Sequence, residues 1–335
     1  MKIVRTDSEL QTPMVDATLR QAGHDLVLLP DGVDQATLIS ELADADLLLM
    51  CYTPIPKAVI EAAPRLRGIV KYGVGIDAID LPTARARGIT VVNIPEYAEE
   101  TVAEGAFALM IALSKRLIPL NDQMRDTGWA WPEPTWLGND IAGKTVGMVG
   151  LGKIGRSMAR MAGAGFRARV IAYSPHTDDA AFADAGVERI DTLHDMLAQS
   201  DIVTIHCVLN DETRHLIGAE ELRAMKPSAI LINVSRGAIV DEAALVDAIQ
   251  QGWIAGAGLD VFSAEPLNRE DHPMAPLFGL PNVILTPHLT FYTAEAMERL
   301  ERETLERCFE MIEDRPVTIL SGDPRLQNQP GATYP

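Results

Sequence analysis

The sequence contains few cysteines and few aromatic residues. Its 335 residues include 3 cysteines, and only 5% of them are Phe, Trp or Tyr. Cys51, Cys207 and Cys308 are odd in number, far apart and set among apolar residues, which disfavours both a disulfide framework and a zinc cluster. We therefore expect no metal centre, and a reducing, cytoplasmic location.

Positive charge and long apolar runs are also scarce. The chain has 29 Lys and Arg against 47 Asp and Glu, a formal charge of -18. Such a surface repels phosphate backbones, so we expect no nucleic-acid partner. The longest apolar stretch, around residues 106–113, is about half the length that a membrane-spanning helix needs. No secretory pattern precedes the first strand-like segment, and we expect no membrane association.

The length and the order of apolar segments predict two α/β domains. Short β-type runs alternate with helical stretches over residues 2–93 and again over 144–285. The second series predicts a doubly wound parallel sheet. A long helix near residues 293–313 is expected to pack back on the first domain. We therefore predict a Rossmann domain, residues 98–291, inserted into a smaller domain of residues 1–97 and 292–335.

Three local features complete this outline. Thr101 and Glu104 have the spacing of a capping box, which predicts a helix start at the domain crossing. Residues 128–136 hold three of the four tryptophans among prolines, which indicates an arm that makes either a local packing contact or a subunit contact. Beyond Asp323 the Pro, Gly and Gln content predicts a loose tail.

A glycine-rich segment points to a dinucleotide. Gly150, Gly152 and Gly155 have G-x-G-x-x-G spacing, directly after a predicted strand (residues 145–149) and at the start of a predicted helix. Gly150 permits the tight turn, Gly152 lets the backbone approach a pyrophosphate, and Gly155 lets helix and strand pack closely. The alternative interpretation is a glycine-rich turn that binds no ligand.

The residue expected to bind the cofactor's ribose departs from the usual pattern. An acidic residue normally ends the next strand and binds the ribose hydroxyls, but Ser174 stands there. Serine removes the repulsion that excludes a 2'-phosphate, yet no arginine follows, and Asp178 and Asp179 would oppose a phosphate. The sequence therefore favours NAD and leaves NADP open.

Three charged residues follow predicted strands of the second sheet, where open α/β sheets place their chemistry. His288 can exchange a proton near neutral pH. Glu265 can hold that imidazole and favour its charged form. Arg236 can bind a carboxylate with two hydrogen bonds. His206, which also follows an apolar run, is the rival base, and we interpret it as a packing or cofactor-side residue.

Together these segments resemble the D-isomer-specific 2-hydroxyacid dehydrogenases, a family that includes phosphoglycerate dehydrogenase-like and C-terminal-binding-protein-like members. The likeness rests on Tyr72-Gly73-Val74-Gly75, the glycine loop, Ser235-Arg236-Gly237, Gly258-Leu259-Asp260-Val261 and Thr286-Pro287-His288, and it spans nearly the full length. It implies a smaller domain of flavodoxin type that binds substrate, and a homodimer. The residues that it implies for cofactor contact, besides the glycines and Ser174, are Val102, Lys153, Ile154, His206, Val234 and Asp260, the last on the nicotinamide amide.

The same resemblance assigns His288 as acid/base with Glu265 as its partner, and Arg236 with the N–H groups of Val74 and Gly75 as carboxylate binders. Phe291 would form an apolar wall that favours a small 2-hydroxy or 2-keto acid without a charged side chain. The remaining candidates for substrate contact are Tyr52 and Tyr72. Two alternatives stay open: a cofactor-sensing binding protein of co-repressor type, and a phosphoglycerate dehydrogenase.

Overall fold

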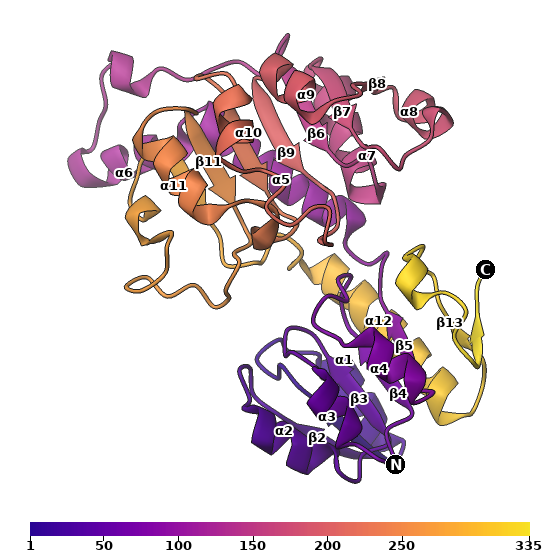
Figure 1. Ribbon diagram of the computed structural model, residues 1–335. Coiled ribbons are helices and arrows are strands. Elements are labelled where there is room, and N and C mark those ends of the chain that lie inside the picture. Colours follow the sequence, from indigo (N-terminus) through magenta and orange to yellow (C-terminus); the bar gives the residue numbers. More distant parts are fainter. The chain divides into compact units, whose positions relative to one another are not determined.

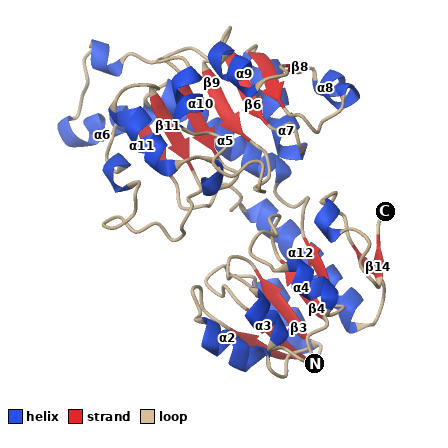
Figure 2. Cartoon of the chain, viewed as in Figure 1, coloured by secondary structure: helices blue, strands red, loops and turns tan.

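The computed structural model describes residues 1–335, which divide into two compact units. Unit 1 comprises Met1–Ala98 and Thr293–Pro335, and unit 2 comprises Glu99–Tyr292. The expected boundaries, after residues 97 and 291, lie one residue from these. Both units are built on parallel sheets with helices beside them, which confirms the predicted fold class (Figure 1, Figure 2).

Unit 1 contains a five-stranded parallel sheet in the order β2-β1-β3-β4-β5, the order of flavodoxin-type folds. The central strands are buried at every residue, because helices cover both faces of a parallel sheet. Its elements are β1 (Lys2–Arg5), α1 (Pro13–Gln21), β2 (Asp25–Leu28), α2 (Gln35–Leu42), β3 (Leu47–Met50), α3 (Lys57–Glu61), β4 (Gly68–Lys71), α4 (Leu81–Ala86), β5 (Thr90–Asn93), α12 (Ala294–Ile312), β13 (Val317–Thr318), η5 (Pro324–Leu326) and β14 (Ala332–Thr333).

The long helix α12 belongs to unit 1, as predicted. Thr293 caps it by accepting the N–H of Ala296 at 3.2 Å. Glu301, buried on α12, accepts the N–H groups of Met14 at 2.6 Å and Val15 at 3.1 Å. These donors lie at the start of α1, where backbone N–H groups lack partners within the helix. Residues almost 290 positions apart are thereby joined.

The predicted loose tail is wrong. Strand β14 pairs with β13, and η5 precedes it. The side chain of Gln329 accepts the N–H of Val91 at 2.8 Å and donates to the Val91 carbonyl at 2.8 Å. A single amide therefore pairs with the exposed edge of β5 as another strand would.

Unit 2 contains a seven-stranded parallel sheet in the order β12-β11-β10-β9-β6-β7-β8, a doubly wound arrangement. Its elements are α5 (Glu99–Ser114), α6 (Leu117–Thr127), η1 (Pro134–Trp136), β6 (Thr145–Val149), α7 (Lys153–Arg160), η2 (Met161–Gly165), β7 (Arg169–Tyr173), α8 (Asp179–Ala185), β8 (Glu188–Arg189), α9 (Leu193–Gln199), β9 (Ile202–Ile205), α10 (Ala219–Ala224), β10 (Ile230–Asn233), η3 (Gly237–Ile239), α11 (Glu242–Gln250), β11 (Gly256–Leu259), η4 (Ala275–Leu277) and β12 (Val283–Leu285).

Two apolar cores lie on the two faces of this sheet. One includes residues of α5, α7 and α8, and the other residues of α9, α10 and α11. Helix α5 begins at Glu99 rather than Thr101, so the predicted capping box is wrong. Acidic residues at 99 and 100 suit the first turn, because they face the positive end of the helix dipole.

Helix α6 and the segment after it differ from the rest of unit 2. The helix was not predicted, and none of its residues is buried. Large apolar side chains are exposed on it and beyond it, including Trp131 at 72% and Leu137 at 78%. The Trp129 and Trp131 rings meet edge to face with centroids 6.0 Å apart. Across the whole chain, every helix falls short of the length and apolar character that crossing a bilayer requires.

Candidate active site

The glycine loop of unit 2 leaves open backbone at the start of a helix. Gly150 has a φ of +94°, and a Cβ there would lie 2.7 Å from the Cys207 nitrogen. A Cβ at Gly155 would lie 2.7 Å from the Gly150 carbonyl oxygen, so helix α7 packs closely on the loop. Around Gly152, the residue before α7, a Cβ would meet nothing within 4 Å. This geometry fits a pyrophosphate held by backbone N–H groups.

Ser174 follows β7 and is tied to the same loop. Its Oγ accepts the N–H of Leu151 at 3.1 Å and lies 2.8 Å from Thr177 Oγ1. Arg189, the cation nearest to Thr177, donates to the Thr177 carbonyl and is paired with Asp179 at 2.8 Å and Asp191 at 3.4 Å. A hydroxyl group therefore occupies the expected ribose position, and the neighbouring guanidinium already has two carboxylate partners.

His206 lies beside the glycine loop and has one nitrogen without a partner. Its Nε2 is 2.9 Å from Thr204 Oγ1, whereas Nδ1 is buried and makes no hydrogen bond. Burial lowers the pKa of His206 to about 4, so this imidazole is neutral at neutral pH. A buried, unpartnered nitrogen is rare in folded proteins. Together with the open glycine loop, it fits a ligand with polar atoms at this position.

Arg236 lies on a turn after β10 that Asn233 shapes. The Asn233 side chain accepts the Ser235 N–H at 3.1 Å and donates to the Arg236 carbonyl at 2.9 Å. The Ser235 hydroxyl donates to the Cys207 carbonyl, which connects this turn to the residue after His206. The guanidinium is half-buried and its Nη1 donates to the Ser235 carbonyl at 2.7 Å. The arginine is thus held close to its own turn.

Glu265 and His288 form a hydrogen-bonded pair. His288 Nδ1 lies 2.7 Å from Glu265 Oε2, and the other oxygen, Oε1, accepts the Phe262 N–H at 2.8 Å. Burial raises the pKa of Glu265, but the hydrogen bond and charge of His288, the Phe262 N–H and the charge of Arg236 outweigh it, and the net pKa is lowered. Three residues predicted from sequence are therefore electrostatically coupled.

The backbone of His288 has a φ of +57°, the left-handed region that a histidine rarely adopts. Asp260, which is 0% exposed, holds the surrounding loop. Its Oδ1 accepts the Thr286 hydroxyl at 2.6 Å and the Leu289 N–H at 3.1 Å. Its Oδ2 accepts the Thr290 N–H at 3.0 Å and hydroxyl at 2.7 Å. Sequence reasoning missed this anchoring role, which no local spacing indicates.

The other residues of unit 2 that the sequence predicted for the site have different environments. The Phe291 ring is buried and meets the His288 ring edge to face, with centroids 6.3 Å apart. Val234 is buried in the core beneath the sheet, and Val102 and Ile154 pack against that core from the helices. Lys153 lies at the start of α7, with its ammonium 3.1 Å from the Glu99 carboxylate.

In unit 1, the loop after β4 exposes two backbone donors. The N–H groups of Val74 and Gly75 donate no hydrogen bond within the protein. Asn93 Nδ2 donates to the Val74 carbonyl at 2.6 Å, and Ile94 N–H donates to the Gly73 carbonyl at 3.1 Å, which fixes this loop. Two adjacent, open N–H groups are suited to an anionic oxygen.

The two tyrosines of unit 1 have different environments. Tyr52 is at the surface, and the Lys71 ammonium lies 5.7 Å from its ring centroid. Tyr72 is 1% exposed, and its hydroxyl donates to the Thr6 carbonyl at 2.5 Å. The structure places Tyr72 in the core, so the expectation that it contacts substrate is corrected. Asp7, which the sequence did not single out, organises this region by accepting the N–H groups of Cys51, Tyr52 and Thr53.

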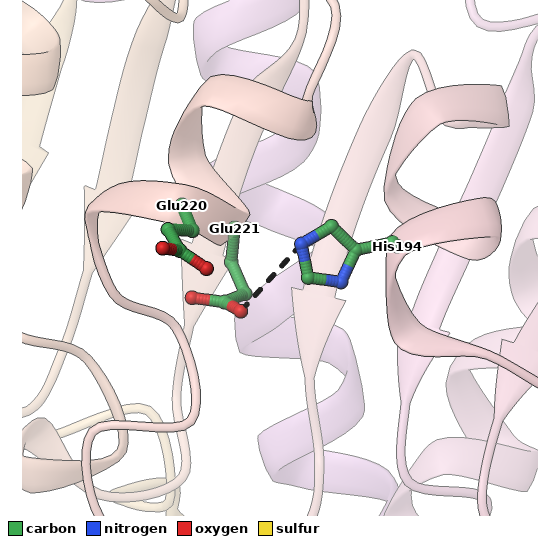
Figure 3. Close-up of side chains that lie close together, drawn as sticks. All are labelled: His194, Glu220 and Glu221. Carbon is green, nitrogen blue, oxygen red and sulfur yellow. Dashed lines mark ion pairs between the residues drawn. The ribbon is translucent and has the colours of Figure 1, made fainter.

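Three side chains of kinds that can bind a metal ion lie close together on α9 and α10, apart from the residues described above (Figure 3). The ligand atoms of His194, Glu220 and Glu221 lie within 4.8 Å of one another, with His194 Nε2 3.8 Å from Glu221 Oε1. Glu221 already accepts the Gly218 N–H at 3.0 Å as part of the helix cap. The other two residues are exposed. No second observation points to an ion, and we assign no metal site.

The fold and this site define a class: a two-unit α/β protein with a dinucleotide-binding loop and a histidine–carboxylate pair near an arginine. Comparison with known proteins identifies a family within this class. Residues 107–290 match the family model "D-isomer specific 2-hydroxyacid dehydrogenase, NAD binding domain".

A glyoxylate reductase of Korarchaeum cryptofilum is 42% identical over 297 residues, covering 87% of this chain and 85% of that protein. A D-3-phosphoglycerate dehydrogenase of Mycobacterium tuberculosis is 40% identical and covers 82% of this chain, but the match spans only 51% of that longer protein. The crystal structure of a D-lactate dehydrogenase from Aquifex aeolicus, complexed with NAD and lactic acid, has a TM-score of 0.83 at 28% identity, covering 93% of this chain and 95% of that one.

The chain belongs to the D-isomer-specific 2-hydroxyacid dehydrogenase family, which confirms the resemblance seen in the sequence. It is an oxidoreductase of the class that acts on CH–OH groups with a nicotinamide cofactor.

Proposed function

We propose that this enzyme interconverts a small 2-keto acid and the corresponding D-2-hydroxy acid, with His288 as the acid/base. The carrying observation is the His288–Glu265 hydrogen bond of 2.7 Å with Arg236 near enough to lower the pKa of Glu265. Glyoxylate reductase, the name of a relative matched over most of both chains, is consistent with a small substrate.

The proposed chemistry follows from these groups. A bound nicotinamide supplies or accepts the hydride at the second carbon of the substrate. In reduction, His288 donates a proton from Nε2 to the carbonyl oxygen as that oxygen gains negative charge, and in oxidation it removes the same proton. Glu265, on Nδ1, stabilises the imidazolium form that reduction requires. Arg236 binds the substrate carboxylate and polarises the adjacent carbonyl.

We assign further substrate contacts as part of the proposal. The open N–H groups of Val74 and Gly75 are suited to the substrate carboxylate. The Phe291 ring, next to His288, provides an apolar surface that disfavours a charged side chain on the substrate. Tyr52, the other candidate for substrate contact, lies at the surface, whereas Tyr72 is buried.

For the cofactor, we propose a preference for NAD over NADP. The glycine loop, with Gly150, Gly152, Lys153, Ile154 and Gly155, would hold the pyrophosphate, and Ser174 would contact the ribose. A 2'-phosphate would need an available cation, but Arg189 is paired with Asp179 and Asp191. His206 Nδ1, buried and without a partner, is the proposed polar contact beside the loop. Asp260 already accepts four hydrogen bonds from residues 286–290. It would bind the nicotinamide amide only by losing one of these four hydrogen bonds.

We also propose a homodimer formed through α6 and the segment up to Leu137. A helix without a buried residue, followed by exposed tryptophans, is unusual in a monomer, because exposed apolar patches of this kind mark interfaces. A cytoplasmic location is proposed on the three unpaired cysteines, two of which are buried as thiols.

The test is a spectrophotometric screen of glyoxylate, pyruvate, hydroxypyruvate and longer 2-keto acids with NADH and NADPH in parallel. We expect turnover on small acids, and His288→Ala should lower kcat by about two to four orders of magnitude. His194→Ala is the matched control, because this exposed histidine lies on α9 outside the site. A full rate in His288→Ala would remove His288 from the mechanism.

Two alternatives have distinct outcomes when 3-phosphohydroxypyruvate is added to the same screen. A phosphoglycerate dehydrogenase, the activity named for the mycobacterial relative, would prefer 3-phosphohydroxypyruvate to every acid without a phosphate group. A cofactor-sensing binding protein would bind NADH tightly and turn over no acid at all. Either result would replace the proposed function.

A further inference from the structure

The catalytic pair depends on the backbone of Phe262 and Ser263. Glu265 Oε1 accepts the Phe262 N–H at 2.8 Å, while Oε2 lies 2.7 Å from His288 Nδ1. The carboxylate therefore bridges its own turn and the histidine. A movement of the backbone at residues 261–263 would turn the Phe262 N–H away from Oε1 and change the direction of Oε2 toward His288. The orientation of Glu265 toward His288 is fixed only as well as this short stretch is fixed.

A second carboxylate holds the same stretch from the opposite side. Glu242, the first residue of α11, is only 8% exposed. Its Oε1 accepts the Ser263 N–H at 2.6 Å, and its Oε2 accepts the Ser263 hydroxyl at 2.5 Å. Burying a carboxylate is costly unless its oxygens receive hydrogen bonds, and here both do. Its place in the first turn of α11 adds the favourable helix dipole.

His272 completes the surroundings of Glu242. Its Nδ1 accepts the Met274 N–H at 3.1 Å, which assigns the proton to Nε2. That Nε2 is buried without a hydrogen bond and lies 3.7 Å from Glu242 Oε2. The His272 ring also meets the Phe262 ring edge to face, with centroids 6.4 Å apart. The His272 Nε2 therefore faces the Glu242 carboxylate, and the His272 ring packs against the Phe262 ring.

The Arg236 turn packs on this stretch as well. A Cβ added to Gly237 would lie 1.9 Å from the Phe262 carbonyl carbon and 2.3 Å from the Ser263 nitrogen. Gly237 is the residue next to Arg236, so the arginine turn and the Glu265 turn touch through bare backbone. The backbone of Phe262 and Ser263 therefore contacts all three turns: Glu265 accepts the Phe262 N–H, Glu242 accepts the Ser263 N–H, and Gly237, next to Arg236, packs on the peptide between them.

We propose that Glu242 is a positioning residue for catalysis: by gripping Ser263, it holds the 262–265 turn so that Glu265 faces His288. This inference rests on the proposed acid/base role of the Glu265–His288 pair. Glu242 acts through Ser263 and Glu265 and touches no reacting atom. Helix α11 does not need Glu242 as its cap, because Asp241 already caps that helix by accepting the Ala244 N–H at 3.1 Å.

The direction of the effect follows from charge. Glu265 lies 2.7 Å from His288 Nδ1, where a carboxylate stabilises a protonated imidazole, and the charges of His288 and Arg236 both lower the pKa of Glu265. Without Glu242 the turn relaxes, the Glu265–His288 contact weakens, and the imidazolium is less stabilised. The pH above which keto acid reduction declines should then move to a lower value. His272, whose Nε2 lies 3.7 Å from Glu242 Oε2, is the other titratable group that faces Glu242.

The experiment compares pH profiles of kcat for keto acid reduction in Glu242→Ala, Glu242→Gln and Ser263→Ala. We expect Glu242→Ala to lower kcat at least tenfold and to shift the basic limb to lower pH. Glu242→Gln, whose amide oxygen can still accept the Ser263 N–H, should recover most of the rate. Ser263→Ala loses one of the two bonds and should fall between them, which keeps the test available if Glu242→Ala folds poorly.

Two controls separate positioning from stability. Glu221→Ala removes another hydrogen-bonded glutamate of unit 2, one that caps α10, and should reduce thermal stability without moving the pH profile. In a Glu265→Gln background, Glu242→Ala should cause little further loss of kcat, because a residue that acts through Glu265 has nothing left to position. Fully multiplicative losses, or a pH profile unchanged as in Glu221→Ala, would overturn the inference.

Failure of the proposed function looks different. If the wild type turns over keto acids but Glu265→Gln and His288→Ala keep its rate and pH profile, the acid/base assignment is wrong and the Glu242 inference falls with it. If those two variants behave as expected while Glu242→Ala matches Glu221→Ala, only the Glu242 inference is overturned.

Discussion

Thr290 donates two hydrogen bonds to one oxygen of Asp260, from its N–H at 3.0 Å and from its hydroxyl at 2.7 Å. The other oxygen receives Thr286 and Leu289, so a single buried carboxylate fixes the residues on both sides of His288. The left-handed backbone of His288 is stable only because its neighbours are held in this way.

Asp260→Asn should therefore loosen the His288 loop. The new NH2 group would face donors where an acceptor is needed, and hydrogen bonds to a charged group contribute about 1.5–3 kcal/mol each. We expect the free energy of unfolding to fall by about 3 kcal/mol in urea titrations, together with a loss of kcat. Asp241→Asn is the matched control, because asparagine caps a helix as well as aspartate does. Equal stability of the two variants would contradict the anchoring role.

Gly237→Ala should damage both stability and rate. The added Cβ would lie 1.9 Å from the Phe262 carbonyl carbon, so the two turns must separate. Overpacking of this kind costs about 1–3 kcal/mol. Gly165→Ala makes the same change where a Cβ meets nothing within 4 Å, and it should be nearly neutral. Thermal melts and kcat measured on both variants check the prediction, which fails if Gly237→Ala keeps wild-type values.

His206 should make the protein less stable in mild acid. Its pKa is about 4 when folded and near 6.5 when exposed, so between these values the unfolded chain binds a proton that the folded chain does not. Stability contributed by neutral His206 is complete above pH 6.5 and is lost as the pH falls toward 4. His206→Gln should show a flatter dependence of the urea midpoint on pH across this window. Parallel curves for the two proteins would exclude His206 as the cause.

Ser174→Asp should sharpen the choice between cofactors. A carboxylate at the end of β7 can accept the ribose hydroxyls and repels a 2'-phosphate. We expect the ratio of the NADPH Kd to the NADH Kd to rise at least about tenfold, or 1.4 kcal/mol. Ser228→Asp adds the same charge before β10, at the opposite edge of the sheet, and should leave the ratio unchanged. Fluorescence titration with both cofactors decides, and equal ratios in the two variants would place the ribose elsewhere.

Trp131→Lys should convert the proposed dimer to a monomer. The side chain is 72% exposed in the single chain, and the Trp129 ring that it contacts is also exposed, so the change should leave the fold of the monomer intact. Analytical ultracentrifugation at micromolar concentration should give one chain's mass for this variant and twice that mass for the wild type. Leu28→Lys, at an exposed apolar position of β2 in unit 1, should stay dimeric. A monomeric wild type would end the interface proposal.

The sequence predicts this fold well where burial alone decides. Strand β6 has the bounds predicted for it, Thr145–Val149, and all but its first residue are buried. The residues of the proposed catalytic site could be predicted because Arg236, Glu265 and His288 follow β10, β11 and β12, which are neighbours in the sheet. Parallel neighbours place their carboxyl ends at one edge.

The failures of prediction arise from long-range contacts. The tail composition suggested disorder, but one glutamine, Gln329, pairs with the edge of β5. Tyr72 lies within a family motif, yet its hydroxyl is bonded inside unit 1. Glu242 and Ser263 are 21 residues apart, and Asp260 and Thr290 are 30 apart. No periodicity or spacing rule indicates which partner a buried carboxylate will find, so these contacts became visible only in three dimensions.

The insertion of unit 2 between the two parts of unit 1 has a consequence for synthesis on the ribosome. Residues 1–98 emerge first, but Glu301, which receives the N–H groups of Met14 and Val15, emerges some 200 residues later. Unit 2 is contiguous and can complete its sheet as it leaves the exit tunnel, since domains generally fold as units during translation. Unit 1 therefore stays incomplete until translation is nearly finished. Until then, the surface that α12 will cover is open to chaperones.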